Sequence, residues 1–160
     1  MRKTQLSAAT ALTLAFATPA FAGGTHGGGH YSFGEPGDPA KADRTVSVTA
    51  EDDGKMAFDM DLSTIRKGET IRFVVANRGE LAHEFSIGDT GSQRAHARMM
   101  ARMPDMHHED DPTTITMEPG ETKEIVWSFS KPIQGNVVFA CNIPGHADGG
   151  MIHKVAFRPS

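Results

Sequence analysis

The sequence predicts an all-β protein, a Greek-key antiparallel β-sandwich with a short helical insertion rich in methionine and histidine. Apolar residues alternate with polar residues in short runs, and turn-forming residues separate the runs. The clearest turns lie at residues 52–54, 67–69, 77–79 and 118–121. About eight or nine short strands at this spacing are typical of a sandwich. The chain has 160 residues, which suits one domain with its own core.

Each expected strand has one apolar face. Val46 and Val48 share a face of the first strand, and Trp127 and Phe129 share a face of a later one, because side chains two apart in a strand point the same way. The expected strands cover residues 44–50, 55–61, 70–77, 83–87, 113–117, 122–129, 136–141 and 151–157.

The first 22 residues have the features of a secretory signal peptide. Arg2 and Lys3 give a basic start, and residues 8–17 are small and apolar. The Ala-Phe-Ala sequence at 20–22 has the small-x-small pattern of a cleavage site. The apolar run is shorter than the about 20 residues that a transmembrane helix needs. We therefore expect export to the periplasm, cleavage after about Ala22 and no membrane insertion.

Two further segments are expected after the signal peptide. Residues 23–43 are rich in glycine and proline and contain two histidines, which predicts a flexible Gly/His-rich N-terminal segment. Residues 44–160 form the folded domain. The whole chain has 16 Lys+Arg and 20 Asp+Glu, a formal net charge of -4. This mild acidity argues against nucleic acid as a partner.

The chemistry of the sequence is concentrated around Cys141, the single cysteine. It cannot form an intramolecular disulfide, so in an exported chain its thiol is expected to be either buried and inert or metal-bound. His146 and Met151 follow it on a loop of proline and glycine residues. A thiolate, a thioether and two imidazoles are the ligands of a trigonal copper site with a weak axial sulfur. His83 is the candidate for the second imidazole.

The same residues carry a resemblance to a known family. The loop Cys-Asn-Ile-Pro-Gly-His at 141–146, with Met151 beyond it, resembles the C-terminal ligand loop of the cupredoxins, the blue or type 1 copper proteins. The sequence Asn-Arg-Gly-Glu-Leu-Ala-His-Glu-Phe at 77–85 is similar to the segment that carries their first histidine. The resemblance covers residues 44–160 and is closest to small periplasmic cupredoxins associated with copper tolerance.

The resemblance implies a ligand set for one type 1 copper. His83, Cys141 and His146 would be the equatorial ligands, and Met151 either the axial ligand or a core residue. Familiar electron carriers of the family often have asparagine after the first histidine, where this chain has Glu84. The Glu84 carboxylate is expected either to hydrogen-bond the backbone of the cysteine loop or to point outward.

Residues 88–111 are an insertion beyond what a compact sandwich needs. They predict a helix over residues 92–103, with Ser92 as its cap and Pro104 after its end. His96, Met100 and Met103 share one face of such a helix, while Met99, Met103 and Met106 are spaced for another.

Two interpretations of the insertion remain open from the sequence. In the first interpretation, its methionines are core residues that pack the helix onto the sandwich. Alternatively, since thioethers prefer Cu(I) and imidazoles bind either oxidation state, the insertion is an auxiliary copper site. The ligands of that auxiliary site would be Met99, Met103, Met106, His107 and His108.

The expected function is copper tolerance, with one-electron Cu(I)/Cu(II) redox at the type 1 site. Additional copper is expected only under the second interpretation of the insertion. The alternative is a dedicated electron shuttle between periplasmic redox partner proteins, docking near Ile143, Pro144 and Ala147. No Ser-His-Asp or paired-carboxylate arrangement stands out in the sequence, so we expect a binding protein and not an enzyme, with oxidation of Cu(I) at the type 1 site as the one activity left open.

Overall fold

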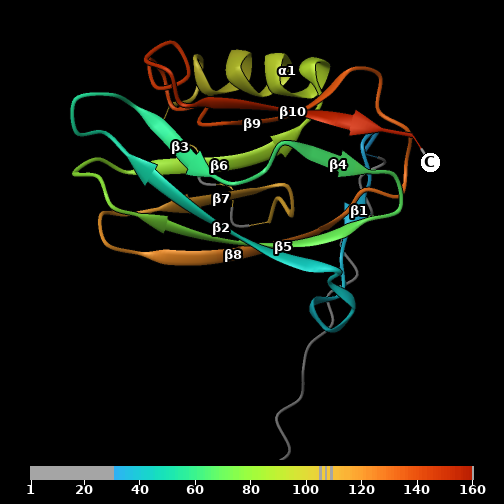
Figure 1. Cartoon of the computed structure of the whole chain (residues 1–160). Helices are drawn as coiled ribbons and strands as arrows, with labels where there is room; N and C mark the ends of the chain where they lie inside the picture. The colour runs from blue at the N-terminus through green and yellow to red at the C-terminus, as the bar shows by residue number, and fades with distance from the viewer. Residues whose placement is uncertain (1–30, 105, 107, 109, 160) are drawn as a thin grey trace, which may run out of the picture.

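Two five-stranded sheets face each other in the computed structural model, which describes residues 31–104, 106, 108 and 110–159 (Figure 1). The first sheet has the order β1-β8-β5-β2-β3 and the second β4-β10-β9-β6-β7. The first consists of β1 (Glu35–Pro36), β8 (Thr122–Ser128), β5 (Thr70–Asn77), β2 (Arg44–Glu51) and β3 (Ala57–Met60). The second consists of β4 (Thr64–Arg66), β10 (Ile152–Arg158), β9 (Asn136–Ala140), β6 (His83–Gly88) and β7 (Thr114–Met117).

The sandwich is confirmed, but the expectation of purely antiparallel pairing is wrong. β2 pairs with β5 in parallel, with Val46 opposite Phe73. β10 pairs with β4 in parallel as well. Between β2 and β5 the chain passes through β4, which belongs to the other sheet. The chain therefore returns to the first sheet by a crossover, and a crossover makes parallel neighbours possible where a hairpin cannot.

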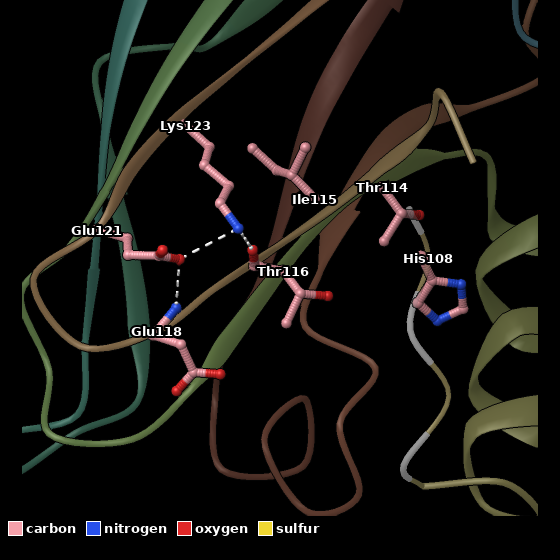
Figure 2. A pocket seen from close by; sticks show the side chains of 7 residues that line it. All are labelled: His108, Thr114, Ile115, Thr116, Glu118, Glu121 and Lys123. Atoms are coloured by element: carbon pink, nitrogen blue, oxygen red, sulfur yellow. Dashed lines mark hydrogen bonds and ion pairs between the residues drawn. The ribbon is translucent and has the colours of Figure 1, made fainter. Parts of the chain in front are cut away.

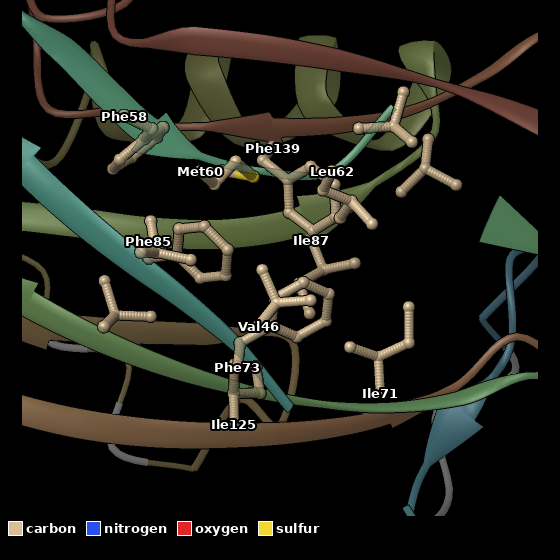
Figure 3. Packing of buried hydrophobic residues seen from close by; sticks show 14 of the residues in the cluster. Val46, Phe58, Met60, Leu62, Ile71, Phe73, Phe85, Ile87, Ile125 and Phe139 are labelled. Carbon is tan, nitrogen blue, oxygen red and sulfur yellow. The ribbon is translucent and has the colours of Figure 1, made fainter. Parts of the chain in front are cut away.

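The core fills the space between the sheets (Figure 3). Along β5 every second residue is buried, as the alternating sequence predicts. Phe73 of this strand packs against Phe85 of β6 and Phe139 of β9, with ring centroids 5.6 and 5.2 Å apart. Aromatic rings at this spacing stabilise the contact between the two sheets, because they bury apolar surface and pack in favourable tilted arrangements.

The packed domain begins earlier than residue 44. Phe33 is 2% exposed and belongs to the core. Its ring and that of Tyr31 each lie 5.2 Å from the ring of Trp127, and β1 pairs with β8. Residues 31–43 are thus held by aromatic burial and an added edge strand, unlike the flexible segment expected there. Residues 1–30, with the expected signal peptide, lie outside the described residues.

The insertion contains the helix α1 (Thr90–Met100). It begins two residues before the expected start, because Asp89 is the N-cap: its carboxylate accepts from the Ser92 backbone N–H, and the Ser92 hydroxyl pairs with the Asp89 backbone. The expected cap, Ser92, is instead the third residue of this capping box. The helix ends at Met100, three residues before the expected end.

The helix covers the outer face of the second sheet (Figure 1). The Gln93 amide donates to the backbone oxygens of Ser86 in β6 and Val138 in β9, both at 3.0 Å. All six residues of β6 are buried, because the core covers one face of this strand and α1 covers the other. Two successive residues of β6 can therefore both hold buried polar side chains on opposite sides of the sheet.

Candidate metal centres

Three buried side chains with metal-binding atoms meet where β6 begins and β9 ends. The Nδ1 atoms of His83 and His146 lie 3.2 Å apart, and Cys141 Sγ lies 3.4 Å from His146 Nδ1. All three donor atoms lie within 4.8 Å of one another. The exposed fraction is 0% for His83 and Cys141 and 8% for His146. We call these three residues the Cys141 cluster; the sequence predicted all of them.

Backbone hydrogen bonds close the loop that carries Cys141 and His146. Met151 O accepts from the Cys141 N–H, and His146 O accepts from the Met151 N–H, both at 3.0 Å. Gly145 has φ +90° and Gly150 has φ +117°, in the left-handed region that side chains disfavour. A Cβ at Gly150 would also lie 2.9 Å from Met56 O. The sharp return of the chain therefore depends on glycine.

Asp52 orients the first histidine, a role that sequence reasoning missed. Its carboxylate accepts from the backbone N–H groups of Glu80 and Leu81 at 2.8 to 3.0 Å, which holds the pKa of Asp52 below its ordinary value. Asp52 Oδ2 lies 3.1 Å from His83 Nε2. Since an ionised carboxylate can only accept, Nε2 carries the hydrogen and the Nδ1 lone pair points into the Cys141 cluster. No local pattern in the sequence indicates this contact, because Asp52 belongs to a polar turn.

The protonation states of the cluster suit a bound metal. Burial lowers the pKa of His83 and of His146, so both rings are neutral donors at pH 7. Burial raises the pKa of Cys141 to about 12, so the thiol is protonated until a metal displaces the proton. The backbone N–H of Glu84 donates to Cys141 Sγ at 3.3 Å. A thiolate and two imidazoles in a buried site fit copper in both oxidation states.

Met151 lies at the end of the same loop and is 0% exposed. Its backbone is hydrogen-bonded to both Cys141 and His146, so the loop fixes its position relative to these two residues. Its burial is compatible with both roles expected from the sequence, the axial ligand and the core residue.

A second group of buried donors lies on the other face of β6. Glu84 Oε2 is 3.5 Å from both His96 Nε2 and His108 Nε2, and the two nitrogens are 3.1 Å apart. Met100 Sδ lies 3.1 Å from His108 Nε2. We call Glu84, His96, Met100 and His108 the Glu84 cluster.

The Glu84 carboxylate does hydrogen-bond the cysteine loop, one of the two roles expected for it. Its Oε1 accepts from the backbone N–H and the side-chain amide of Asn142 at 3.3 and 3.1 Å. Burial raises the pKa of Glu84 to about 7 although these hydrogen bonds lower it. Burial and the neighbouring His108 lower the pKa of His96 to about 4.

The structure gathers different insertion residues from those predicted. Of the expected auxiliary ligands only His108 belongs to the Glu84 cluster; Met103 is 46% exposed, and His107 lies outside the described residues. Met99 and Met106 are half-buried and do not join the cluster of donors. Met100, 2% exposed, takes their place with His96. The sequence feature that could have predicted His96 and Met100 as partners is their i, i+4 spacing on one helix face. Only the fold brings Glu84 to that face.

Comparison with known proteins identifies the family. Residues 44–158 match the copper binding proteins of the plastocyanin/azurin family. The chain is a cupredoxin. This cupredoxin is 48% identical over 141 residues to the "Copper-resistant cuproprotein CopI" of Rubrivivax gelatinosus, a match that covers 85% of this chain and 82% of that protein. It is 43% identical over 122 residues to the protein of the same name from Vibrio cholerae serotype O1, covering 76% and 70%.

Solved structures agree with this fold. Reduced auracyanin from Roseiflexus castenholzii superimposes on the cupredoxin with a TM-score of 0.57 at 23% identity, covering 74% of this chain and 99% of that one. Copper is the cofactor that the family and the donor set of the Cys141 cluster both indicate. Within the described residues, no helix has the length and apolar character needed to cross a membrane.

Proposed function

We propose that this cupredoxin is an exported copper-tolerance protein of the periplasm. In this proposal His83, Cys141 and His146 hold a type 1 copper and Met151 is its weak axial ligand. The observation that carries the proposal is the convergence of three buried soft or borderline donors within 4.8 Å. The identity to two proteins named for copper resistance supports the physiological role.

The bound copper would supply a one-electron Cu(I)/Cu(II) couple. The chain holds its donor atoms in one geometry that suits both oxidation states. Asp52 fixes the ring of His83, the N–H of Glu84 fixes the sulfur of Cys141, and the closed loop fixes His146. Because burial excludes water from these residues, a change of oxidation state requires little rearrangement.

Free Cu(I) is the substrate in this function. The copper held by His83, Cys141 and His146 would accept one electron from free Cu(I), which would leave as Cu(II), and a periplasmic redox partner protein would take up that electron. Export follows from the signal peptide expected at residues 1–22. The sequence of the mature N-terminus, expected at Gly23, tests this part directly.

A dedicated electron shuttle is the second candidate. Leu81, next to the Asp52 carboxylate that holds His83, is 47% exposed, and Pro144 beside His146 is exposed as well. Apolar side chains at the rim of a buried redox site suit brief docking of a partner protein. This function uses the Cys141 cluster alone and leaves the Glu84 cluster without a role.

Growth on copper separates the two functions. Cells that lack the protein are expected to become copper-sensitive, and the wild-type gene to restore growth while Cys141→Ser does not. The purified copper-loaded protein should show intense thiolate-to-copper absorption in the visible region. Unchanged copper tolerance in the deletion strain, together with rapid electron exchange with a cytochrome, would favour the shuttle. A wild-type protein without the visible band would contradict both functions.

A further inference from the structure

The Glu84 cluster has the geometry of a metal site. A tetrahedral ion with donors at about 2.0 Å places neighbouring donor atoms about 3.3 Å apart. The observed separations are 3.1 Å between the two imidazole nitrogens, 3.5 Å from each nitrogen to the carboxylate oxygen and 3.1 Å from His108 Nε2 to Met100 Sδ. The donors come from β6, α1 and the segment after α1, so the tertiary fold assembles the site.

Burial makes hydrogen bonding alone a poor explanation of this cluster. The exposed fractions of the side chains are 1% for Glu84, 10% for His96 and 4% for His108. Glu84 Oε2 is a buried oxygen with no hydrogen-bond partner in the described structure, which is unfavourable unless a proton or a cation compensates it. One proton shared between the two facing Nε2 atoms would leave this oxygen unpaired. A cation among the donors would bind all of them.

Glu84 also contacts the Cys141 cluster directly. Its backbone N–H donates to Cys141 Sγ at 3.3 Å, and its Oε1 accepts from Asn142, the next residue of the ligand loop. The other oxygen of the same carboxylate faces His96 and His108. One residue therefore contacts both clusters, through its backbone on one side of the sheet and its side chain on the other.

We propose that Glu84, His96, His108 and Met100 bind a second copper ion, and that Glu84 couples this site to the type 1 copper. The coupling rests on the proposed function, whereas the second site does not. Two imidazoles, a carboxylate and a thioether are donors for copper in either oxidation state. Zn²⁺ also binds imidazole and carboxylate donors, although it does not share the preference of Cu(I) for the thioether. A cation here adds positive charge beside the Cys141 sulfur, stabilises the more electron-rich Cu(I) state and raises the reduction potential of the type 1 site.

The coupling acts in both directions. Because linkage is reciprocal, an ion in the second site must bind more tightly when the type 1 copper is reduced than when it is oxidised. An incoming ion therefore makes the type 1 site a stronger oxidant, and oxidation of the type 1 site loosens the second ion. This relation would tie the loading of the second site to the redox state of the first.

An open groove gives the second site access to solvent. A pocket of about 360 Å³ extends along β7, lined by Thr114, Ile115 and Thr116, and reaches His108 at its end beside α1 (Figure 2). Glu118 and Glu121 line its other end, where Lys123 bonds Glu121 and the Thr116 backbone oxygen. The groove thus leads from a surface with carboxylates to one imidazole of the site, a route for a cation.

Titration of the full mature protein with Zn²⁺, which has no redox chemistry of its own, tests the proposal. A single equivalent of Cu(II) is added first, and the intense visible band shows that it occupies the type 1 site. Zn²⁺ does not displace it there, because Cu(II) binds such donors more tightly. Zn²⁺ is then titrated against a competing chelator, and the type 1 reduction potential and visible band are recorded. We expect one Zn²⁺ per chain, a rise in potential and a shift of the band on saturation.

Three variants locate the effect. A His96→Ala/His108→Ala double variant should lose Zn²⁺ affinity at least tenfold and lose the rise in potential. Glu84→Gln keeps the backbone N–H and an amide oxygen for Asn142 but removes the charge, and should behave the same way while keeping the visible band. Met103→Leu, an exposed methionine of the same insertion, should match the wild type.

The outcomes separate the two proposals. Equal Zn²⁺ binding in the double variant and the wild type would overturn the second site. Binding that depends on His96 and His108 but leaves the type 1 potential and band unchanged would overturn the coupling. One Zn²⁺ retained by Cys141→Ser would support the second site even if the type 1 assignment failed.

Discussion

The two faces of β6 carry clusters that are built differently. His83 faces the interior of the sandwich and meets two residues of one short loop that backbone bonds hold closed. Its neighbour Glu84 faces α1 and meets side chains from the helix and from the segment after it. The comparison shows that one strand covered on both faces can position donors for two sites, because successive side chains point to opposite sides. It also shows that the first site depends on strands and a loop, and the second on helix docking.

The largest expected effect is the loss of the thiolate, which is a donor in the Cys141 cluster and not in the Glu84 cluster. Cys141→Ser should abolish the intense visible absorption of the copper-loaded protein, because no thiolate remains to transfer charge to Cu(II). The Glu84 cluster should keep its Zn²⁺, since none of its donors is changed. Absorption spectra and metal content of the purified variant give both answers. A band that persists in this variant would refute Cys141 as a ligand.

Removing the support of one ligand should have a smaller effect. Asp52→Asn replaces the carboxylate that accepts from His83 Nε2, and copper affinity of the first site should fall about 10-fold to 100-fold. Competition with a chelator of known affinity measures the loss. Since a carboxylate partner makes the imidazole a stronger donor to Cu(II), the reduction potential should also rise. If copper affinity and reduction potential are unchanged in Asp52→Asn, the backbone alone orients His83.

Changing a single donor of the second cluster should have a more modest effect. Met100→Leu conserves volume but removes the sulfur that lies 3.1 Å from His108 Nε2, and Cu(I) affinity of this cluster should fall about tenfold, or about 1.4 kcal/mol. Met99→Leu changes the adjacent methionine, which does not join the cluster, and serves as the matched control. Cu(I) competition titrations compare the two. A loss of Cu(I) affinity in Met99→Leu but not in Met100→Leu would favour the ligand set expected from the sequence, which contains Met99 and not Met100.

The smallest expected effect concerns the backbone of the ligand loop. Gly145→Ala places a side chain at φ +90°, which should lower the free energy of unfolding by about 1 kcal/mol. A Cβ at this position meets no atom within 4 Å, so strain is the only cost. Urea unfolding of the metal-free protein measures it. An unchanged midpoint would mean that the loop relaxes to a different conformation.

Much of the fold could be predicted because alternation reflects a local property of strands. The pattern of Ile71, Phe73 and Val75 predicted β5 and its buried face. The edge strand β1 and the burial of Phe33 were missed, since a segment rich in glycine and proline has no alternation and is held by contacts with the distant Trp127. Parallel pairing of β2 with β5 was missed for a similar reason, because strand direction depends on the route of the chain between sheets.

The sequence by itself determined the Cys141 cluster and its family, because Cys141, His146 and Met151 lie on one loop whose spacing is a local property and His83 lies in a recognisable segment. Only the tertiary structure decided that Asp52 holds His83 and that Glu84 joins His96, Met100 and His108. Residues far apart in the chain acquire a common site only when strand pairing and helix packing set their separation. No local pattern along the chain encodes that separation.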